Sequence, residues 1–220
     1  MSGDKLIIAV DGPAGAGKST IAKKIAKILE IEYIDTGAMY RALTLKVIKN
    51  GIDSKDSESI LKLMESTSIC FKDNKIYLDG TRVDKEIREN IINNNVSNVA
   101  KIREVREEMV SMQRELSKSN NIIMDGRDIG TVVLPNANFK FFITASVEER
   151  AKRRHKELIE KGEKNISYKQ VLAEIQKRDK IDSTREVAPL RKSFDSYEID
   201  TTNKTVEECV DEIITIMGGR

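Results

Sequence analysis

The stretch DGPAGAGKST at residues 11–20 constrains the fold more than any other part of the chain, because of what stands on either side of it. The apolar run LIIAV at 6–10 predicts a buried strand, and KSTIAKKIAKIL at 18–29 predicts an amphipathic helix. Between them, the sequence matches the phosphate-loop pattern G-x-x-x-x-G-K-S/T at each fixed position. This order predicts a site for a nucleoside triphosphate. The expected apolar stripe of the helix is Ile21, Ile25, Ile28 and Leu29.

A loop of this kind directs successive backbone N–H groups into one concavity that holds phosphate oxygens, and the following helix adds its N-terminal dipole. We expect Lys18 to bridge the β- and γ-phosphates of ATP and Ser19 to supply an oxygen to Mg²⁺. The motif alone fits kinases, GTPases, motor ATPases and DNA-binding ATPases. The expected nucleotide-binding residues are Gly12, Pro13, Ala14, Gly15, Ala16, Gly17, Lys18, Ser19 and Thr20.

The composition fits a folded α/β protein and gives no argument for a polymeric or lipid partner. The 220 residues are 39% hydrophobic and 34% charged, enough for one large domain or a core with insertions. A net charge of +2 does not favour nucleic-acid or membrane binding. The N-terminal apolar run is too short for a signal peptide, and no segment approaches the roughly 20 apolar residues of a membrane span. We expect a cytoplasmic monomer.

The cysteines and the single histidine argue against metal and triad chemistry. Cys70 and Cys209 lack metal-ligand spacing, and we interpret both as reduced thiols, with a disulfide left open by the sequence. Because His155 is the only histidine, neither a histidine-based metal site nor a histidine-dependent triad is expected.

Apolar runs alternate with helical patterns along the chain, which predicts a parallel sheet covered by helices on both faces. The predicted strands are 6–10, 32–35, 121–125, 139–144 and 196–200. The predicted helices are 18–29, 38–49, 56–65, 99–117, 147–161, 167–181 and 205–217. Residues 68–83 break this rhythm with short alternating stretches and with turn signals at Asp73-Asn74 and Asp79-Gly80, so we predict an inserted antiparallel meander.

Polar residues follow two of the predicted strands. Asp125 ends the strand at 121–125, near the phosphate loop in the expected parallel order, where it could orient Mg²⁺ or cap the next turn. Arg127 and Asp128 follow at once and suggest either a second, polar substrate or a local ion pair.

The segment DTGAMYR at 35–41 follows the other strand and opens a predicted helix. We expect Thr36 to cap that helix, with Tyr40 and Arg41 in its first turn. Arg41 suits bidentate phosphate recognition, unless it is only a surface arginine.

Two predicted charged helices resemble a lid that closes over transferred phosphate. Arg178, Asp182 and Arg185 follow one helix face at positions i, i+4 and i+7. A cluster upstream either serves the same purpose or is ordinary solvated charge. Its members are Arg150, Arg153 and Arg154.

A small-molecule kinase fits these features best. A GTPase is disfavoured, because NKTV at 203–206 lacks the aspartate of a guanine-reading motif and no D-x-x-G sequence follows the candidate strands. A motor or DNA-binding ATPase is disfavoured, since the chain is short and lacks a separate nucleic-acid module. A nucleotide-responsive switch or a nucleic-acid-binding ATPase stays the alternative from a different functional class. A kinase for UMP, AMP or another metabolite stays an alternative.

Five segments together make the sequence similar to the bacterial cytidylate kinases, a family of nucleoside monophosphate kinases. The segments are DGPAGAGKST, DTGAMYRA, VSNVAKIREVR, DGRDIGTVVLPNA and KRDKIDSTREVAPL, and they span most of the chain. The resemblance implies a three-layer P-loop kinase fold with an enlarged monophosphate-binding insert that contains the meander. It implies a core of about 1–35, 118–146 and 187–220, the insert at about 36–117 and a lid at about 147–186.

The same resemblance implies a role for each matched residue. Thr36, Tyr40 and Arg41 would line the monophosphate site, with Arg127 joining Arg41 on the phosphate. Ser97, Arg106 and Asp128 would face the cytosine. Arg178 and Asp182 would hold the ribose hydroxyls, and Arg185 the phosphates. We therefore expect transfer of the γ-phosphoryl group of Mg-ATP to CMP, and also dCMP, without a covalent intermediate. The expected catalytic residues are Lys18, Arg127, Arg178 and Arg185, and the expected metal-site residues are Ser19 and Asp125.

Overall fold

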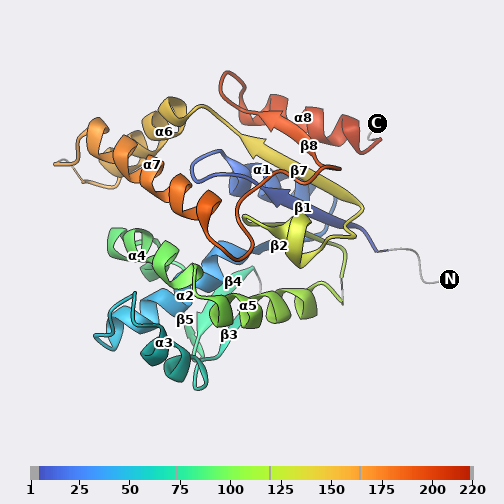
Figure 1. Cartoon of the computed structure of the whole chain (residues 1–220). Helices are drawn as coiled ribbons and strands as arrows, with labels where there is room; N and C mark the ends of the chain where they lie inside the picture. Colours follow the sequence, from blue (N-terminus) through green and yellow to red (C-terminus); the bar gives the residue numbers. More distant parts are fainter. Residues whose placement is uncertain (1–4, 73, 119, 164, 219–220) are drawn as a thin grey trace.

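The computed structural model describes residues 5–72, 74–118, 120–163 and 165–218. Its centre is a parallel five-stranded sheet in the order β2-β6-β1-β7-β8 (Figure 1). Because β1 lies in the middle, the phosphate loop leaves the centre of the edge formed by the carboxyl ends of the strands, where parallel sheets bind ligands. The strands are β1 (Ile7–Asp11), β2 (Glu32–Asp35), β6 (Ile122–Asp125), β7 (Phe139–Thr144) and β8 (Tyr197–Asp200).

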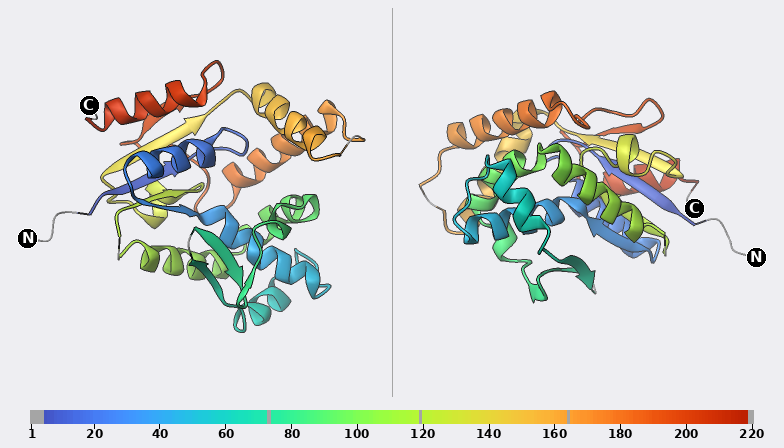
Figure 2. Two further views of the ribbon diagram at one scale, coloured as in Figure 1. Left: turned by 180° about the vertical axis from the view of Figure 1, so that it is seen from behind. Right: turned by 60° about the horizontal axis from the view of Figure 1, so that its bottom comes forward.

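Helices cover both faces of the sheet and complete the three predicted layers (Figure 2). Helices α1 (Lys18–Ile28) and α8 (Val206–Ile216) pack on the face that carries Ile8 and Val10. Helix α5 (Arg103–Leu116) and the π-helical turn η2 (Ile129–Val133) pack on the opposite face, with Ala9. Successive side chains of β1 thus enter the apolar clusters on opposite faces of the sheet, as expected for a strand buried on both sides.

The expected stripe of α1 is partly wrong. Ile21 and Ile25 are buried, but Ile28 is 57% exposed, and Ala22 and Ala26 fill the stripe in its place. Cys209 lies buried on α8 and Cys70 is exposed; within the described residues both are free thiols.

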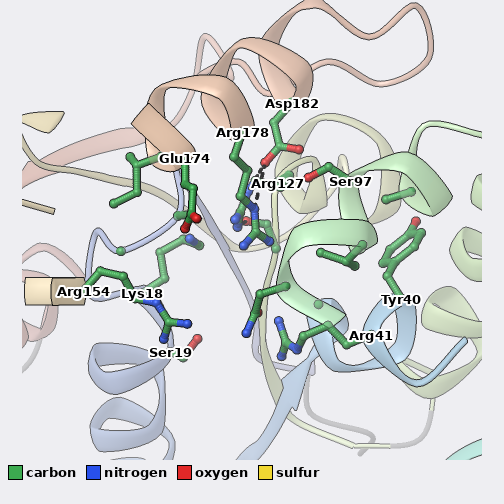
Figure 3. Close-up of a pocket in the computed structure, with 18 of the residues that line it drawn as sticks. Lys18, Ser19, Tyr40, Arg41, Ser97, Arg127, Arg154, Glu174, Arg178 and Asp182 are labelled. Carbon is green, nitrogen blue, oxygen red and sulfur yellow. Dashed lines mark hydrogen bonds and ion pairs between the residues drawn. The ribbon is translucent and has the colours of Figure 1, made fainter. Parts of the chain in front are cut away.

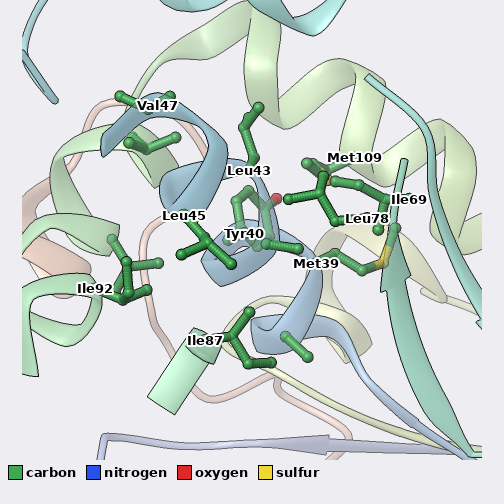
Figure 4. Packing of buried hydrophobic residues seen from close by; sticks show 14 of the residues in the cluster. Met39, Tyr40, Leu43, Leu45, Val47, Ile69, Leu78, Ile87, Ile92 and Met109 are labelled. Atoms are coloured by element: carbon green, nitrogen blue, oxygen red, sulfur yellow. The ribbon is translucent and has the colours of Figure 1, made fainter. Parts of the chain in front are cut away.

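The chain between β2 and β6 forms a second unit with its own apolar core, drawn in Figure 4. The core joins α2 to α4 and α5 and to the small sheet, and its buried members all fall within residues 38–109. The predicted meander is confirmed as a three-stranded antiparallel sheet in the order β3-β4-β5. The elements are α2 (Thr36–Lys49), α3 (Ser57–Met64), β3 (Ile69–Lys72), β4 (Lys75–Leu78), β5 (Thr81–Arg82), the 3₁₀ turn η1 (Glu86–Arg88) and α4 (Asn90–Ala100).

Both hairpin turns of the meander use left-handed backbone, as turn residues do. Asp79 and Gly80 have φ of 48° and 76°. Asn74 has φ of 56°, while Asp73, the other half of that turn signal, lies outside the described residues.

The single helix predicted at 99–117 is wrong. The helix α5 begins only at Arg103, and a separate helix, α4, precedes it. The sequence NIINNNVSN disfavours a helix by propensity, because asparagine side chains compete for backbone hydrogen bonds. Packing decides otherwise: Ile92, Val96 and Val99 are buried in the second core.

Helices α6 (Val147–Glu160) and α7 (Tyr168–Thr184) pack against each other around a small cluster of their own. Ser167 begins α7 with a reciprocal capping box to Gln170, and the helix runs three residues beyond the predicted end. The buried members of the cluster are Ala151, Leu158, Val171 and Ile175. Among the described residues, no helix combines the length and apolar character that crossing a membrane would require.

Candidate active site

A cavity of about 670 Å³ lies at the carboxyl edge of the sheet, between the phosphate loop, the second unit and α7 (Figure 3). Most of the residues predicted for the site line this cavity. They are Ala14, Gly15, Gly17, Lys18, Ser19, Thr20, Thr36, Tyr40, Arg41, Ser97, Arg106, Asp125, Arg127, Asp128, Arg178, Asp182 and Arg185. Gly12, Pro13 and Ala16 do not reach its wall and belong to the loop backbone behind it.

The phosphate loop takes the backbone conformation that its glycines were expected to provide. Gly12, Gly15 and Gly17 have φ of 146°, 77° and 90°. A Cβ on Gly12 would lie 1.9 Å from the carbonyl oxygen of Ile143, so the loop also needs glycine there for a close approach to β7. Lys18 is 6% exposed and its Nζ donates to the carbonyl of Pro13 at 2.8 Å.

The charge of Lys18 is poorly solvated, which makes it sensitive to an added anion. Burial, and after it the neighbouring charge of Arg127, lowers the pKa of Lys18 from its ordinary value. A phosphate at the loop would offset both effects, because it supplies the opposite charge within a buried site.

Asp125 lies beside the loop, as the parallel strand order predicts. Ser19 Oγ donates to Asp125 Oδ2 at 2.7 Å, and the hydroxyl of Tyr33 donates to Oδ1 at 2.9 Å. Burial raises the pKa of Asp125. A hydroxyl and a carboxylate side by side are hard oxygen donors that fit Mg²⁺ bound mainly through substrate phosphates. In the described ranges, no cluster of three or more carboxylate, thiolate or imidazole ligands that could hold a metal ion occurs.

The start of α2 differs from the prediction in its cap. Because the helix begins at Thr36, the capping residue is Asp35, which accepts the N–H of Ala38 at 2.9 Å. Thr36 instead donates its hydroxyl to the carbonyl of Asp125 at 2.7 Å, tying α2 to β6. Tyr40 and Arg41 therefore lie in the second turn, not the first.

Arg41 is not a solvated surface arginine. Its Nη2 donates to Asp35 Oδ2 at 2.8 Å, and its side chain is only 14% exposed. The guanidinium faces the cavity from the end opposite α7 (Figure 3).

One end of the cavity joins residues of α2, α4 and α5 with Asp128, which follows β6, and Arg185, which follows α7. Arg106 of α5 forms an ion pair with Asp128, and its guanidinium lies over the ring of Tyr40, 5.6 Å from the centroid. Arg185 Nη2 lies 3.6 Å from Asp128 Oδ1. Buried Ser97 of α4 lines the same end. Arg127 and Asp128 are paired across elements, which argues against a merely local pair.

A second group links the end of β6 to α7. Arg127 Nε donates to Asp182 Oδ2 at 3.0 Å, and Arg178 Nε lies 3.9 Å from the same oxygen. Burial opposes ionisation of Asp182, yet Arg127, Arg178 and Arg185 lower the pKa of its carboxyl overall. Burial, with repulsion from Arg127, lowers the pKa of Arg178 to about 10.

Several guanidinium N–H donors lack an acceptor in this cavity. Buried donors without a partner are costly and are satisfied in most native structures, so their gathering points to an anionic ligand. In the described part of the chain, the buried guanidinium nitrogens without a hydrogen-bond partner are Arg41 Nε, Arg106 Nε, Arg178 Nε and Arg185 Nη2.

The arginines of α6 separate into two kinds. Arg150 turns away from the cavity: it donates to the carbonyl of Ala14 at 3.1 Å and pairs with Asp179 of α7 at 2.8 Å. Arg153 and Arg154 both line the cavity wall. Arg153 donates to Thr201, and Arg154 to Asn90 of α4.

Some residues of the site had no signal in the sequence. Tyr33 does not line the cavity but donates to Asp125, and in the sequence it has the pattern of a core aromatic residue. Asn90 lines the cavity and lies in an asparagine-rich stretch that predicts no helix. The sequence gives no reason to place the charged residues Arg88 and Glu174 anywhere but on the surface, yet both line the cavity. Only the contacts between elements place them at the site.

Comparisons with known proteins agree over nearly the whole chain. The family model for cytidylate kinase matches residues 8–218. A cytidylate kinase of Clostridioides difficile (strain 630) is 56% identical over 210 residues, covering 96% of this chain and 97% of that protein. One of Clostridium botulinum (strain Hall) is 58% identical over 210 residues, covering 96% of each. One of Caldanaerobacter subterraneus is 53% identical over 206 residues, covering 94% and 92%.

Two solved structures share the fold at low identity. An uncharacterized protein from Eubacterium ventriosum has a TM-score of 0.55 at 15% identity, covering 98% of this chain and all of its own. A shikimate kinase from Bacteroides thetaiotaomicron has a TM-score of 0.51 at 11% identity, covering 97% and 98%. At such identities the likeness is one of fold alone, and the fold is that of the P-loop kinases.

Proposed function

We propose a detailed reaction from the premise that this chain belongs to the cytidylate kinase family, and is therefore a nucleoside monophosphate kinase. The general reaction of that family is phosphoryl transfer from ATP to CMP. In detail, we propose that the γ-phosphoryl group of Mg-ATP passes to CMP or dCMP, giving ADP and CDP or dCDP, with no covalent enzyme intermediate. The observation that carries the proposal is one cavity with a phosphate loop at one end and the Arg106–Asp128 pair at the other.

Positioning and charge neutralisation suffice for this chemistry. The acceptor is already an anionic phosphate oxygen, so no general base is needed. The loop backbone and Lys18 hold the phosphates of ATP, while Arg41 and Arg127 hold the phosphate of the acceptor. Arg178 and Arg185 neutralise charge between the two. Ser19 and Asp125 would hold Mg²⁺, which supplies further neutralisation of the triphosphate when bound.

The base end favours cytosine by hydrogen-bond inventory. Cytosine offers an amino donor at position 4 and acceptors at N3 and O2. Uracil instead has a carbonyl acceptor at position 4 and an N–H donor at N3. The Asp128 carboxylate only accepts and the Arg106 guanidinium only donates, so both suit cytosine and oppose uracil. Ser97 can do either and contributes less. Each mismatch costs about 1–3 kcal/mol, so two give roughly 10²–10⁴-fold preference for CMP.

An acceptor panel with Mg-ATP tests the reaction. We expect CDP from CMP at the highest kcat/KM, with dCMP accepted and UMP and AMP poor. Efficient use of UMP or AMP would assign the protein a different acceptor. ATP hydrolysis stimulated by RNA or DNA, without a phosphorylated small product, would contradict a kinase function.

A substitution at Asp128 tests base selection. Asp128→Ala should lower kcat/KM for CMP much more than for UMP and shrink the ratio by at least about tenfold. Asp84→Ala, which changes an acid between β5 and η1 that lies outside the cavity, is the matched control and should leave the ratio unchanged. If Asp128→Ala lowers both activities equally, Asp128 is structural and the base is selected elsewhere.

The division of labour within the chain belongs to the same proposal. Residues at about 1–35, 118–146 and 187–220 form the nucleotide-binding core, those at about 36–117 bind the monophosphate, and those at about 147–186 form the lid. The separate apolar clusters of the second unit and of α6 with α7 support this division. We also propose that the protein acts as a cytoplasmic monomer, which sedimentation and cell fractionation would test.

A further inference from the structure

Asp11, the last residue of β1, is a buried acid that the proposed reaction does not use. It is 5% exposed, and in the described ranges no lysine or arginine nitrogen comes within 4.0 Å of its carboxylate. Its Oδ1 accepts the N–H of Ile129 at 2.7 Å, and its Oδ2 accepts the N–H of Gly130 at 2.8 Å. Burial raises the pKa of Asp11 to about 7, and the two amide bonds act against that rise.

Those two amides are the first of the π-helical turn η2. The first N–H groups of a helical turn have no partner within it, and a side chain just before the turn usually accepts from them. The residue in that position is Asp128, an acid well suited to the task. Its side chain nevertheless makes no such bond. The carboxylate of Asp128 turns to Arg106 and Arg185 instead.

The same segment is fixed against the sheet at further points. The N–H of Gly126 donates to the carbonyl of Val10 at 2.9 Å. A Cβ on Gly126 would meet Thr36 Oγ1 at 2.6 Å, and one on Gly130 would lie 3.4 Å from Asp11 Oδ2. The backbone from 126 to 130 is therefore seated closely on β1 and α2, and small changes there move the side chains of Arg127 and Asp128.

We propose that Asp11 is a positioning residue for base recognition: it caps η2 from the neighbouring strand, so that the carboxylate of Asp128 stays beside Arg106 and Arg185, at the end of the cavity where we propose that the acceptor base binds. The inference rests on the proposed function in one respect, the role of Asp128. Without Asp11, Asp128 has the donors of its own turn as competing partners. A residue beside the ATP loop thus determines how well the far end of the cavity recognises its base.

Amide hydrogen exchange tests the cap without reference to activity. The Asp11→Asn variant keeps the size of the side chain but presents an NH₂ group to one of the two N–H donors. We expect the amides of Ile129 and Gly130 to exchange at least about tenfold faster than in the unsubstituted protein, with other amides of β1 and β6 as the internal reference. Asp11→Ser, a smaller replacement, serves if the first variant fails to fold. Unchanged exchange at both amides overturns the inference.

Kinetics test the consequence for the base. Asp11→Asn should lower the CMP-to-UMP ratio of kcat/KM at least about fivefold through KM for the acceptor, with KM for ATP changed less than about twofold. In an Asp128→Ala background the same substitution should change the ratio less than about twofold, because residues that act through one another are not additive. Asp56→Asn, at the cap of α3 outside the cavity, is the control for losing a capping carboxylate.

The outcomes separate the two hypotheses. Additive losses in the double variant, or an unchanged ratio in Asp11→Asn, overturn the positioning role of Asp11. If Asp128→Ala alone leaves the ratio unchanged, the proposed reading of the base fails and the kinetic part of the inference falls with it. The amide measurement then still decides whether Asp11 caps η2.

Discussion

Lys18 is the residue on which phosphoryl transfer should depend most, through its ammonium group. It is buried at the phosphate loop with a single backbone acceptor, so its charge is available to a phosphate. We expect Lys18→Ala to retain less than about a tenth of kcat, a loss above roughly 1.4 kcal/mol in the barrier, with an unchanged fold. Steady-state kinetics and circular dichroism measure the two. Lys27→Ala, in the last turn of α1, is the control, and equal kcat in both variants would refute the role.

Gly12 and Gly51 allow the two reasons for a glycine, lack of space for a Cβ and a positive φ, to be measured separately. Both have positive φ, but a Cβ at Gly12 would overlap the carbonyl oxygen of Ile143, whereas a Cβ at Gly51 would meet nothing within 4 Å. Gly51→Ala should cost about 1–2 kcal/mol of unfolding free energy, from backbone strain alone. Gly12→Ala should cost at least about 3 kcal/mol or prevent folding, because β7 must shift as well. Urea unfolding measures both, and similar losses would show that the contact with β7 is soft.

Among the elements, the link between β6 and α7 depends on the charge of Asp182. Its arginine neighbours lower the pKa of this carboxyl, so the stabilisation is complete above its ordinary value of 3.8 and is lost as the pH falls through the lower folded value. At pH 7, Asp182→Asn should lower the unfolding free energy by about 1–3 kcal/mol, since Arg127 loses its charged acceptor and Arg178 loses the opposite charge beside it. Urea unfolding of both proteins from pH 7 down to pH 3 should show this difference shrinking.

The control for that series is Glu186→Gln, which changes an exposed acid paired with Arg103. We expect a difference within about 0.5 kcal/mol at every pH. A wild-type advantage over Asp182→Asn that grows as the pH falls would contradict the direction assigned to the pKa of Asp182.

Elements were predictable where the signal is local. The strand, loop and helix around Lys18 follow from periodicity and from one motif, and the parallel order then places Asp125 beside Ser19. Helix α4 was not predictable, because its asparagines disfavour a helix and only packing of Ile92 and Val99 in the second core makes it one. The hydrogen bond from Tyr33 to Asp125 joins residues 92 positions apart and leaves no trace in either neighbourhood of the sequence.

For the molecule as a whole, we predict that α6 and α7 form a lid whose motion depends on both substrates. Their shared core is small, and the linker between them contains Gly162 and few large apolar residues. Amide hydrogen exchange should be fast across 147–181 in the free protein. It should become slow when a non-hydrolysable ATP analogue and CMP are added together. Amides of β1 and β6 are the reference, and equal protection with and without ligands would contradict a closing lid.

The contacts of Arg150 indicate which part of α6 stays in place during that motion. It joins α6 to the carbonyl of Ala14 in the phosphate loop and to Asp179 of α7. The start of α6 is therefore fixed to the phosphate loop, and movement is expected beyond Arg150, toward the linker.

The arginines of the cavity meet a ligand with their counterions already in place. Asp35 accompanies Arg41, Asp128 accompanies Arg106, and Asp182 accompanies Arg127. A phosphate that binds here displaces a carboxylate from an arginine instead of neutralising an unpaired cation. The charge of the phosphate alone therefore contributes little binding free energy. We therefore expect inorganic anions to bind this cavity weakly, and a nucleotide to bind it through the proposed base contacts as well as through its phosphates. Under that proposal, the carboxylate of Asp128 serves twice, as the partner of Arg106 and as the acceptor that selects the base.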